Sequence, residues 1–257
     1  MRVLGPVEVI GAARPFRRAW GADLLAYLAL HPSGASADAW VTALWPERCP
    51  PEATRFSTVS DARRALGRSS SGSDHLPRSV GRLRLGPSVT TDWEQFRSLA
   101  AVRGAGAPDA WAAALELVRG PPLGGLRSLD WAILEGVVAE MEAAIVQLSI
   151  DLAEHHLARA DGRAAERALR RGLLVTPYDE RLYRLLFVAA DRQGNPAGVE
   201  AAMSELVGLV SGERIRGAGA PLGPVDPGGW VHPETVAVYR SVSRRLRHAQ
   251  GIRRRRS

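Results

Sequence analysis

The sequence lacks lysine altogether, so its 34 basic residues are all arginine. Codon usage in a GC-rich genome favours Arg, Ala and Gly together, so arginine richness alone does not indicate nucleic-acid binding. Cysteine is almost absent: Cys49 has no partner for an internal disulfide, which fits a reducing cytosol. No stretch approaches the roughly 18 apolar residues that a membrane span needs. The most apolar N-terminal run, Leu24 to Leu30, is short and carries no signal-peptide cleavage pattern. We therefore expect a cytoplasmic protein with no membrane partner.

Charge is distributed unevenly along the chain. Residues 1–90 carry 12 Arg against 7 acidic residues, residues 91–210 carry 12 against 17, and residues 211–257 carry 10 against 3. Codon usage would spread arginine evenly, but it would not make the middle of the chain acidic. The alternation of sign therefore indicates three segments with separate roles.

The first 90 residues read as a strand, three helices and a hairpin. Alternating valines predict a strand from Arg2 to Ile10, and Ser36 is placed as an N-cap for a short helix. Apolar residues at helical spacing predict a helix from Glu52 to Leu66, with Gly67 as its C-terminal cap. The other elements predicted here are a helix over Ala22–Leu30 and strands over Leu76–Val80 and Arg82–Leu85.

From Asp92 onward the pattern is almost wholly helical. Leu157–Gly162 resembles Val188–Gly194, with the two glycines 32 residues apart and a second helix after each, which is a weak internal repeat of the tetratricopeptide kind. Residues 211–229 are rich in Gly and Pro and are predicted to form a linker, and 230–257 a C-terminal helix with the basic tail Arg253–Arg256. The predicted helices are Trp93–Val102, Asp109–Arg119, Asp130–Ala160, Arg163–Val175, Asp179–Gln193, Pro196–Val210 and Pro233–Gln250.

Several stretches, taken in order, resemble bacterial regulators of the SARP/BTAD family. These regulators join a response-regulator-type winged helix to a bacterial transcriptional activator domain. The matching stretches are Arg2–Val9, Leu24–Pro32, Ala43–Pro46, Thr58–Gly67, Asp92–Phe96 and Ala114–Leu123, and the resemblance spans roughly residues 2–210.

The resemblance implies a mainly α fold in two parts. Residues 1–90 would form a winged helix-turn-helix (α+β) that binds double-stranded DNA, with residues 58–67 in its recognition helix. Residues 91–210 would form an all-α, tetratricopeptide-like activator domain that supports homo-oligomerisation or contact with RNA polymerase or another regulator. The sequence departs from the family at Asp61, where a basic residue is common, at Phe56, where a polar one is common, and at Gly81-Arg82, where an aromatic usually follows the glycine.

The candidate DNA-binding residues lie on the helix over 52–66 and on the hairpin. If Phe56, Val59, Ala62 and Leu66 face the core, the opposite face carries hydroxyls, arginines and Asp61. Arg55 would pair with a guanine and Asp61 with a cytosine amino group, whereas Arg63 and Arg64 would contact phosphates. The full predicted set is Thr54, Arg55, Ser57, Thr58, Asp61, Arg63, Arg64, Arg82 and Arg84.

Two other classes of function are weighed against DNA binding. Asp61 and Phe56 leave open an interaction module whose winged helix no longer binds DNA. An enzyme is not expected, because no nucleophile, acid/base pair or phosphate-binding loop converges in the sequence. No cofactor is expected either, since His155 and His156 are adjacent on a helix, a poor geometry for one metal ion.

Overall fold

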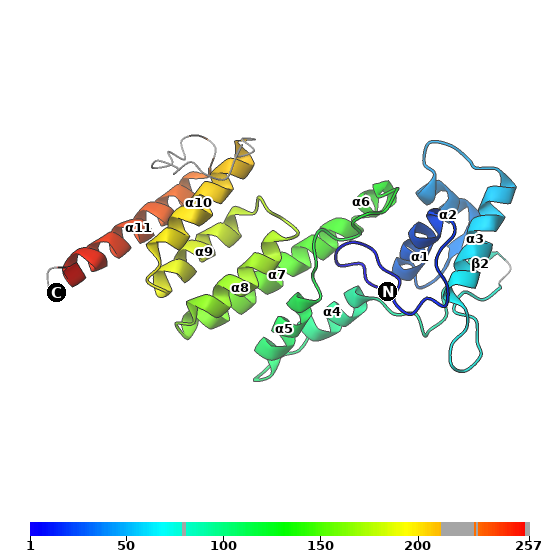
Figure 1. Ribbon diagram of the computed structural model, residues 1–257, viewed down its shortest axis with the longest axis horizontal. Coiled ribbons are helices and arrows are strands. Elements are labelled where there is room, and N and C mark those ends of the chain that lie inside the picture. Colours follow the sequence, from blue (N-terminus) through cyan, green and yellow to red (C-terminus); the bar gives the residue numbers. More distant parts are fainter. Residues whose placement is uncertain (79–80, 212–228, 230, 255–257) are drawn as a thin grey trace. The chain divides into compact units, whose positions relative to one another are not determined.

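The computed structural model describes residues 1–78, 81–211, 229 and 231–254, and the side chains only as far as residue 249 (Figure 1). The predicted linker, apart from Ser211 and Gly229, lies outside the described residues. So do Ser79 and Val80 of the predicted hairpin, and the side chains of the predicted tail Arg253–Arg256.

The described part of the chain is mainly helical, as predicted. It divides into two compact units, one made of Met1–Ala101 and Leu117–Glu142, the other of Val102–Glu116 and the chain from Ala143 onward. The first unit contains α1 (Trp20–Leu30), β1 (Ala35–Ser36), α2 (Ala37–Leu44), α3 (Glu52–Leu66), β2 (Arg82–Leu83), α4 (Asp92–Ala100) and α6 (Asp130–Leu134). The second contains α5 (Ala107–Glu116), α8 (Gly162–Leu173), α9 (Glu180–Arg192), α10 (Pro196–Val210) and α11 (Pro233–Arg254), while α7 (Val137–Ala158) has residues in both.

The strands of the first unit differ from the prediction. β2 is a strand, but it pairs antiparallel with β1, Ala35 opposite Leu83, instead of with the predicted strand at 76–80. The strand predicted over 2–10 is reduced to two isolated bridges, Arg2 with Glu8 and Pro6 with Gly124, because the chain turns back at Gly5. Gly5 has φ +142°, a backbone conformation that side-chain-bearing residues rarely adopt. The winged-helix sheet therefore stays a prediction.

The N-terminal segment is held by a buried carboxylate at the start of α4. Asp92 accepts hydrogen bonds from the backbone N–H groups of Val3 (2.6 Å) and Leu4 (3.2 Å). Both residues are fully buried, so these N–H groups have no access to water. Thr91 and Glu94 form a reciprocal capping box that fixes this end of α4.

Helix ends follow local sequence signals more closely than strands do. Ser36 caps α2 by accepting from the N–H of Ala39 at 3.3 Å, and Gly67 ends α3 with φ +70°, as predicted. The single helix predicted over 130–160 is wrong, because Gly136, with φ +75°, separates α6 from α7.

The helices of the second unit repeat with a period of 34 residues. The N-cap of α8 is Asp161 and that of α10 is Asn195, 34 positions later. Ala160 (φ +60°) and Gly194 (φ +64°) are also 34 residues apart, and both adopt the left-handed backbone conformation in the turn before the next helix. The 32-residue spacing between Gly162 and Gly194 is therefore not the period of the repeat, because the two glycines occupy different positions in it. Gly162 is the first residue of α8, where a Cβ would collide with the carbonyl oxygen of Ala189.

The buried carboxylate of Asp23 in α1 generates a prediction about stability. Its Oδ1 accepts from the N–H of Arg127 at 2.7 Å. Asp23→Ala leaves that N–H without an acceptor, so the free energy of unfolding should fall by about 1–3 kcal/mol. Chemical denaturation measures the change, and unaltered stability would contradict the anchoring role.

A second prediction concerns pH. Burial raises the pKa of Asp23 above its ordinary value, against the opposing effect of its backbone hydrogen bonds. The folded chain therefore holds this proton more tightly than the unfolded chain, and the group contributes stability as the pH falls through the raised pKa. Asp23→Asn is neutral at every pH, so its stability relative to the unmodified chain should decline on acidification. Denaturation curves at a series of pH values test the sign.

Candidate nucleic-acid interface

The buried face of α3 differs from the one that the sequence suggested. Ala62 and Leu66 are buried as predicted, but so are Thr58 (0% exposed) and Asp61 (4%), whereas Phe56 is 67% exposed. The assignment of Thr58 and Asp61 to the outer face is therefore wrong, as is the inward placement of Phe56.

Burial of these two polar residues is possible because their polar groups are hydrogen-bonded. The Thr58 hydroxyl donates to the carbonyl of Thr54 at 2.9 Å. One oxygen of Asp61 accepts from the N–H groups of Arg17 (3.0 Å) and Arg18 (2.9 Å), just before α1. Asp61 thus anchors a loop and does not face solvent, which explains why it is not basic here.

The other predicted residues lie at the surface or at the margin of the helix. Arg64, Arg82 and Arg84 are exposed, and Thr54, Arg55, Ser57 and Arg63 are half-buried. The sequence interpretation missed Phe56 and Ser60, which are exposed at i and i+4 with Arg64 at i+8. That spacing is itself a helical-face signal, but an aromatic residue on it was read as core.

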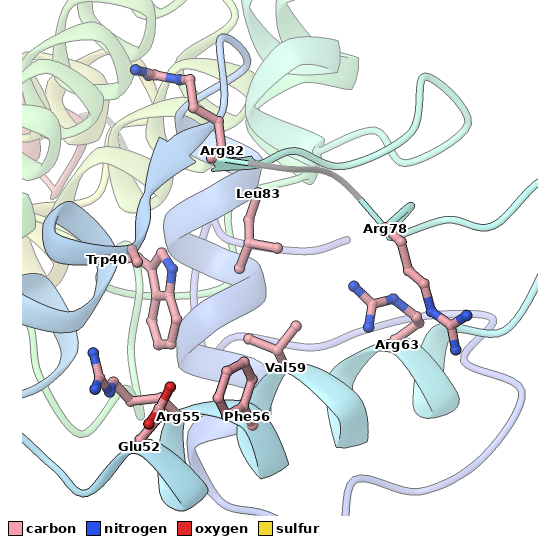
Figure 2. A pocket seen from close by; sticks show the side chains of 11 residues that line it. Trp40, Glu52, Arg55, Phe56, Val59, Arg63, Arg78, Arg82 and Leu83 are labelled. Atoms are coloured by element: carbon pink, nitrogen blue, oxygen red, sulfur yellow. The ribbon is translucent and has the colours of Figure 1, made fainter.

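A pocket of about 440 Å³ opens beside this face, between α2, α3 and the β2 segment. Figure 2 shows the side chains of Phe56 and Val59 rising from α3 toward Trp40 and Leu83. Four arginines and one acidic residue also line the pocket: Arg55, Arg63, Arg78, Arg82 and Glu52. The surface therefore combines apolar contact area with an excess of positive charge.

The arginines of the pocket are not equivalent. Arg63 donates through Nε to the carbonyl of Leu76 at 2.8 Å, and burial, with the nearby charge of Arg78, lowers its pKa. Arg82 donates to the carbonyl of Gly34. The Nε of Arg55 is buried with no hydrogen-bond partner among the described residues. Arg63 thus tethers the segment after α3 by a hydrogen bond, whereas the Nε–H of Arg55 has no acceptor among the described residues.

Metal-binding clusters and membrane-spanning helices are absent from the part of the chain that the structure describes. No group of three or more His, Cys, Asp or Glu residues there could hold a metal ion. No helix there is both long enough and apolar enough to cross a bilayer.

The comparisons with known proteins concern both the helical part and the whole fold. Residues 91–209 match the family model described as the bacterial transcriptional activator domain. No curated protein matches. Among solved structures, Mycobacterium tuberculosis EmbR in complex with a low affinity phosphopeptide is similar, with a TM-score of 0.60 and 24% identity. The similarity covers 96% of this chain and 64% of that one, so this chain spans 64% of the length of its structural neighbour.

The fold and the family match place the chain in a class. Its described part is mainly helical and similar in fold to EmbR. Residues 91–209 match the bacterial transcriptional activator domain, which supports the resemblance to regulators of the SARP/BTAD type.

The different environments of two neighbouring arginines lead to a prediction. Arg63→Ala removes the hydrogen bond to Leu76, so the free energy of unfolding should fall by about 1–2 kcal/mol. Arg64→Ala is the matched control: its side chain is exposed and its Nε bonds only to the carbonyl of Ser60 in its own helix. Urea denaturation should leave the Arg64 variant within about 0.5 kcal/mol of the unmodified chain. Equal losses in both variants would refute this division of roles.

Proposed function

We propose that the protein is a DNA-binding transcriptional regulator whose α3 enters the major groove as the recognition helix of a winged helix. The observation that carries the proposal is the outer face of α3, where Phe56, Ser60 and Arg64 are exposed beside an arginine-lined pocket. An α-helix fits the major groove, where base edges present distinct patterns of donors, acceptors and methyl groups. The activator-domain match and the EmbR-like fold support the same class of function.

The structure leads us to revise the proposed contacts. Arg64 and Arg84 have exposed side chains suited to phosphates, and Ser60 offers a hydroxyl. Arg55 lines the pocket at the margin of this face, and the terminal nitrogens of its guanidinium, not its buried Nε, would meet a guanine or a phosphate oxygen. Thr58 and Asp61 leave the contact set, because their polar groups serve the interior.

The helical part is proposed to be a tetratricopeptide-like module for oligomerisation or for contact with RNA polymerase or another regulator. Its support is the 34-residue offset between α7–α8 and α9–α10, which equals the period of that repeat. Such stacked helix pairs present extended surfaces to protein partners.

Salt dependence is the first test of DNA binding. The logarithm of the association constant for genomic fragments should fall linearly with the logarithm of salt concentration, with a slope of about −0.9 per phosphate contacted. Arg64→Ala should weaken binding to all fragments and reduce the magnitude of the slope by about 1. Fluorescence anisotropy measures both, with Arg48→Ala, an exposed arginine outside the pocket, as the control. If no fragment binds at low salt, the chain is an interaction module and the proposal fails.

Phe56 gives a sharper test of how α3 would read a sequence. An exposed aromatic ring on a recognition helix can pack on the 5-methyl group of thymine. Replacing thymine by uracil in a bound site should weaken binding of the unmodified chain by about fourfold, the value expected for one buried methyl-sized group. Phe56→Ala should bind both versions equally. An undiminished preference for thymine in the Phe56 variant would assign the contact elsewhere.

A further inference from the structure

The short helix α6 exposes two adjacent large aliphatic side chains. Ile133 is 59% exposed and Leu134 is 86% exposed. Both belong to the first unit, whose other large apolar residues are mostly buried. Covering exposed aliphatic side chains removes apolar surface from water, so these two residues favour association with an apolar surface.

Leu134 stands at the edge of a groove of about 500 Å³ between α1, α2 and α6. Tyr27 and Trp131 contribute apolar surface to it. The charged side chains that line it are all acidic: Asp38, Asp130 and Glu135. A nucleic-acid backbone would be repelled by these carboxylates, whereas arginine or lysine side chains would be attracted.

Local contacts keep the groove in shape before anything binds. Tyr27 stacks on His31 with ring centroids 4.0 Å apart and meets Trp131 edge-on at 4.9 Å. The Ser128 hydroxyl donates to the carbonyl of Ala43 at 2.9 Å, which ties the segment before α6 to α2. Because these side chains are already ordered, little of the binding free energy is lost to fixing them when a partner binds.

The groove lies on a different side of α2 from the pocket beside α3. Ala37 and Trp40 of α2 line that pocket, whereas Asp38, Ala39 and Thr42 line the groove. A partner in the groove therefore does not need the surface that we propose for DNA.

We propose that this groove is a docking site for a helical segment of a protein partner that carries large aliphatic side chains flanked by arginine or lysine. The aliphatic side chains of the partner cover Leu134 and Ile133, and its cations approach Asp38 and Asp130, while Glu135 is already hydrogen-bonded to His31 at 2.9 Å. The choice of partner rests on charge complementarity and on the exposed aliphatic pair. It does not depend on DNA binding.

The test uses the full chain and designed peptides. A 15-residue helical peptide with leucines on one face and flanking arginines is titrated into the protein by fluorescence anisotropy. Two comparison peptides replace the arginines by glutamate, or the leucines by alanine. Only the first peptide should bind, and raising the salt concentration should weaken it.

Variants of the groove locate the binding. Leu134→Ala should weaken the basic peptide about tenfold, and the double variant Asp38→Asn with Asp130→Asn about fivefold at low salt. Leu174→Ala, which shortens an exposed leucine of the second unit, is the matched control and should bind normally. Because Leu134 is 86% exposed, its truncation should leave thermal unfolding unchanged.

Three outcomes would overturn the proposal. One is failure of the basic peptide to bind at low salt, and another is equal binding of the glutamate peptide. The third is a self-associated chain that Leu134→Ala converts to monomers in sedimentation, since a second copy would then be the occupant. DNA affinity should be unaffected by Leu134→Ala, so this proposal and the proposed DNA binding fail separately.

Discussion

The first unit depends on buried aspartates that accept hydrogen bonds from backbone N–H groups of distant segments. Asp92 holds residues 3 and 4, Asp61 holds residues 17 and 18, and Asp23 holds residue 127. Each bond joins a helix to a segment without regular structure, where no ladder could satisfy the N–H groups. Both strands in the described residues of this unit are two residues long, so little sheet orders its loops, and the buried carboxylates hold these loops instead.

Helix positions could be predicted from the sequence because their signals are local. The bounds of α3 and the cap at Ser36 depend on residues within one or two turns. Which side of α3 faces inward depends on partners far along the chain. Asp61 is buried because residues 17 and 18 bring their N–H groups to it, and nothing near residue 61 reveals this. The sequence therefore predicted the bounds of α3 correctly but assigned Thr58, Asp61 and Phe56 to the wrong faces of that helix.

Because the chain has no lysine, arginine supplies the permanently charged cations both in its interior and at its surface. Arg63 serves the interior, Arg64 lies on the surface, and Arg55 stands between these roles with an unpaired Nε. The guanidinium group suits this range, because it bonds in a plane in several directions and stays charged when partly buried. Composition consequently says little about which arginine meets a partner, and the hydrogen bonds of each one decide it.

The turns before α8 and α10 have the same shape but differ in residue identity, alanine in one and glycine in the other, with Asp161 and Asn195 as the caps. Aligning such repeats by identical residues shifts them by two positions, whereas aligning them by capping side chains superimposes the ends of α7 and α9 and the starts of α8 and α10. Divergent helical arrays are therefore better compared by the chemistry at their helix starts than by their glycines.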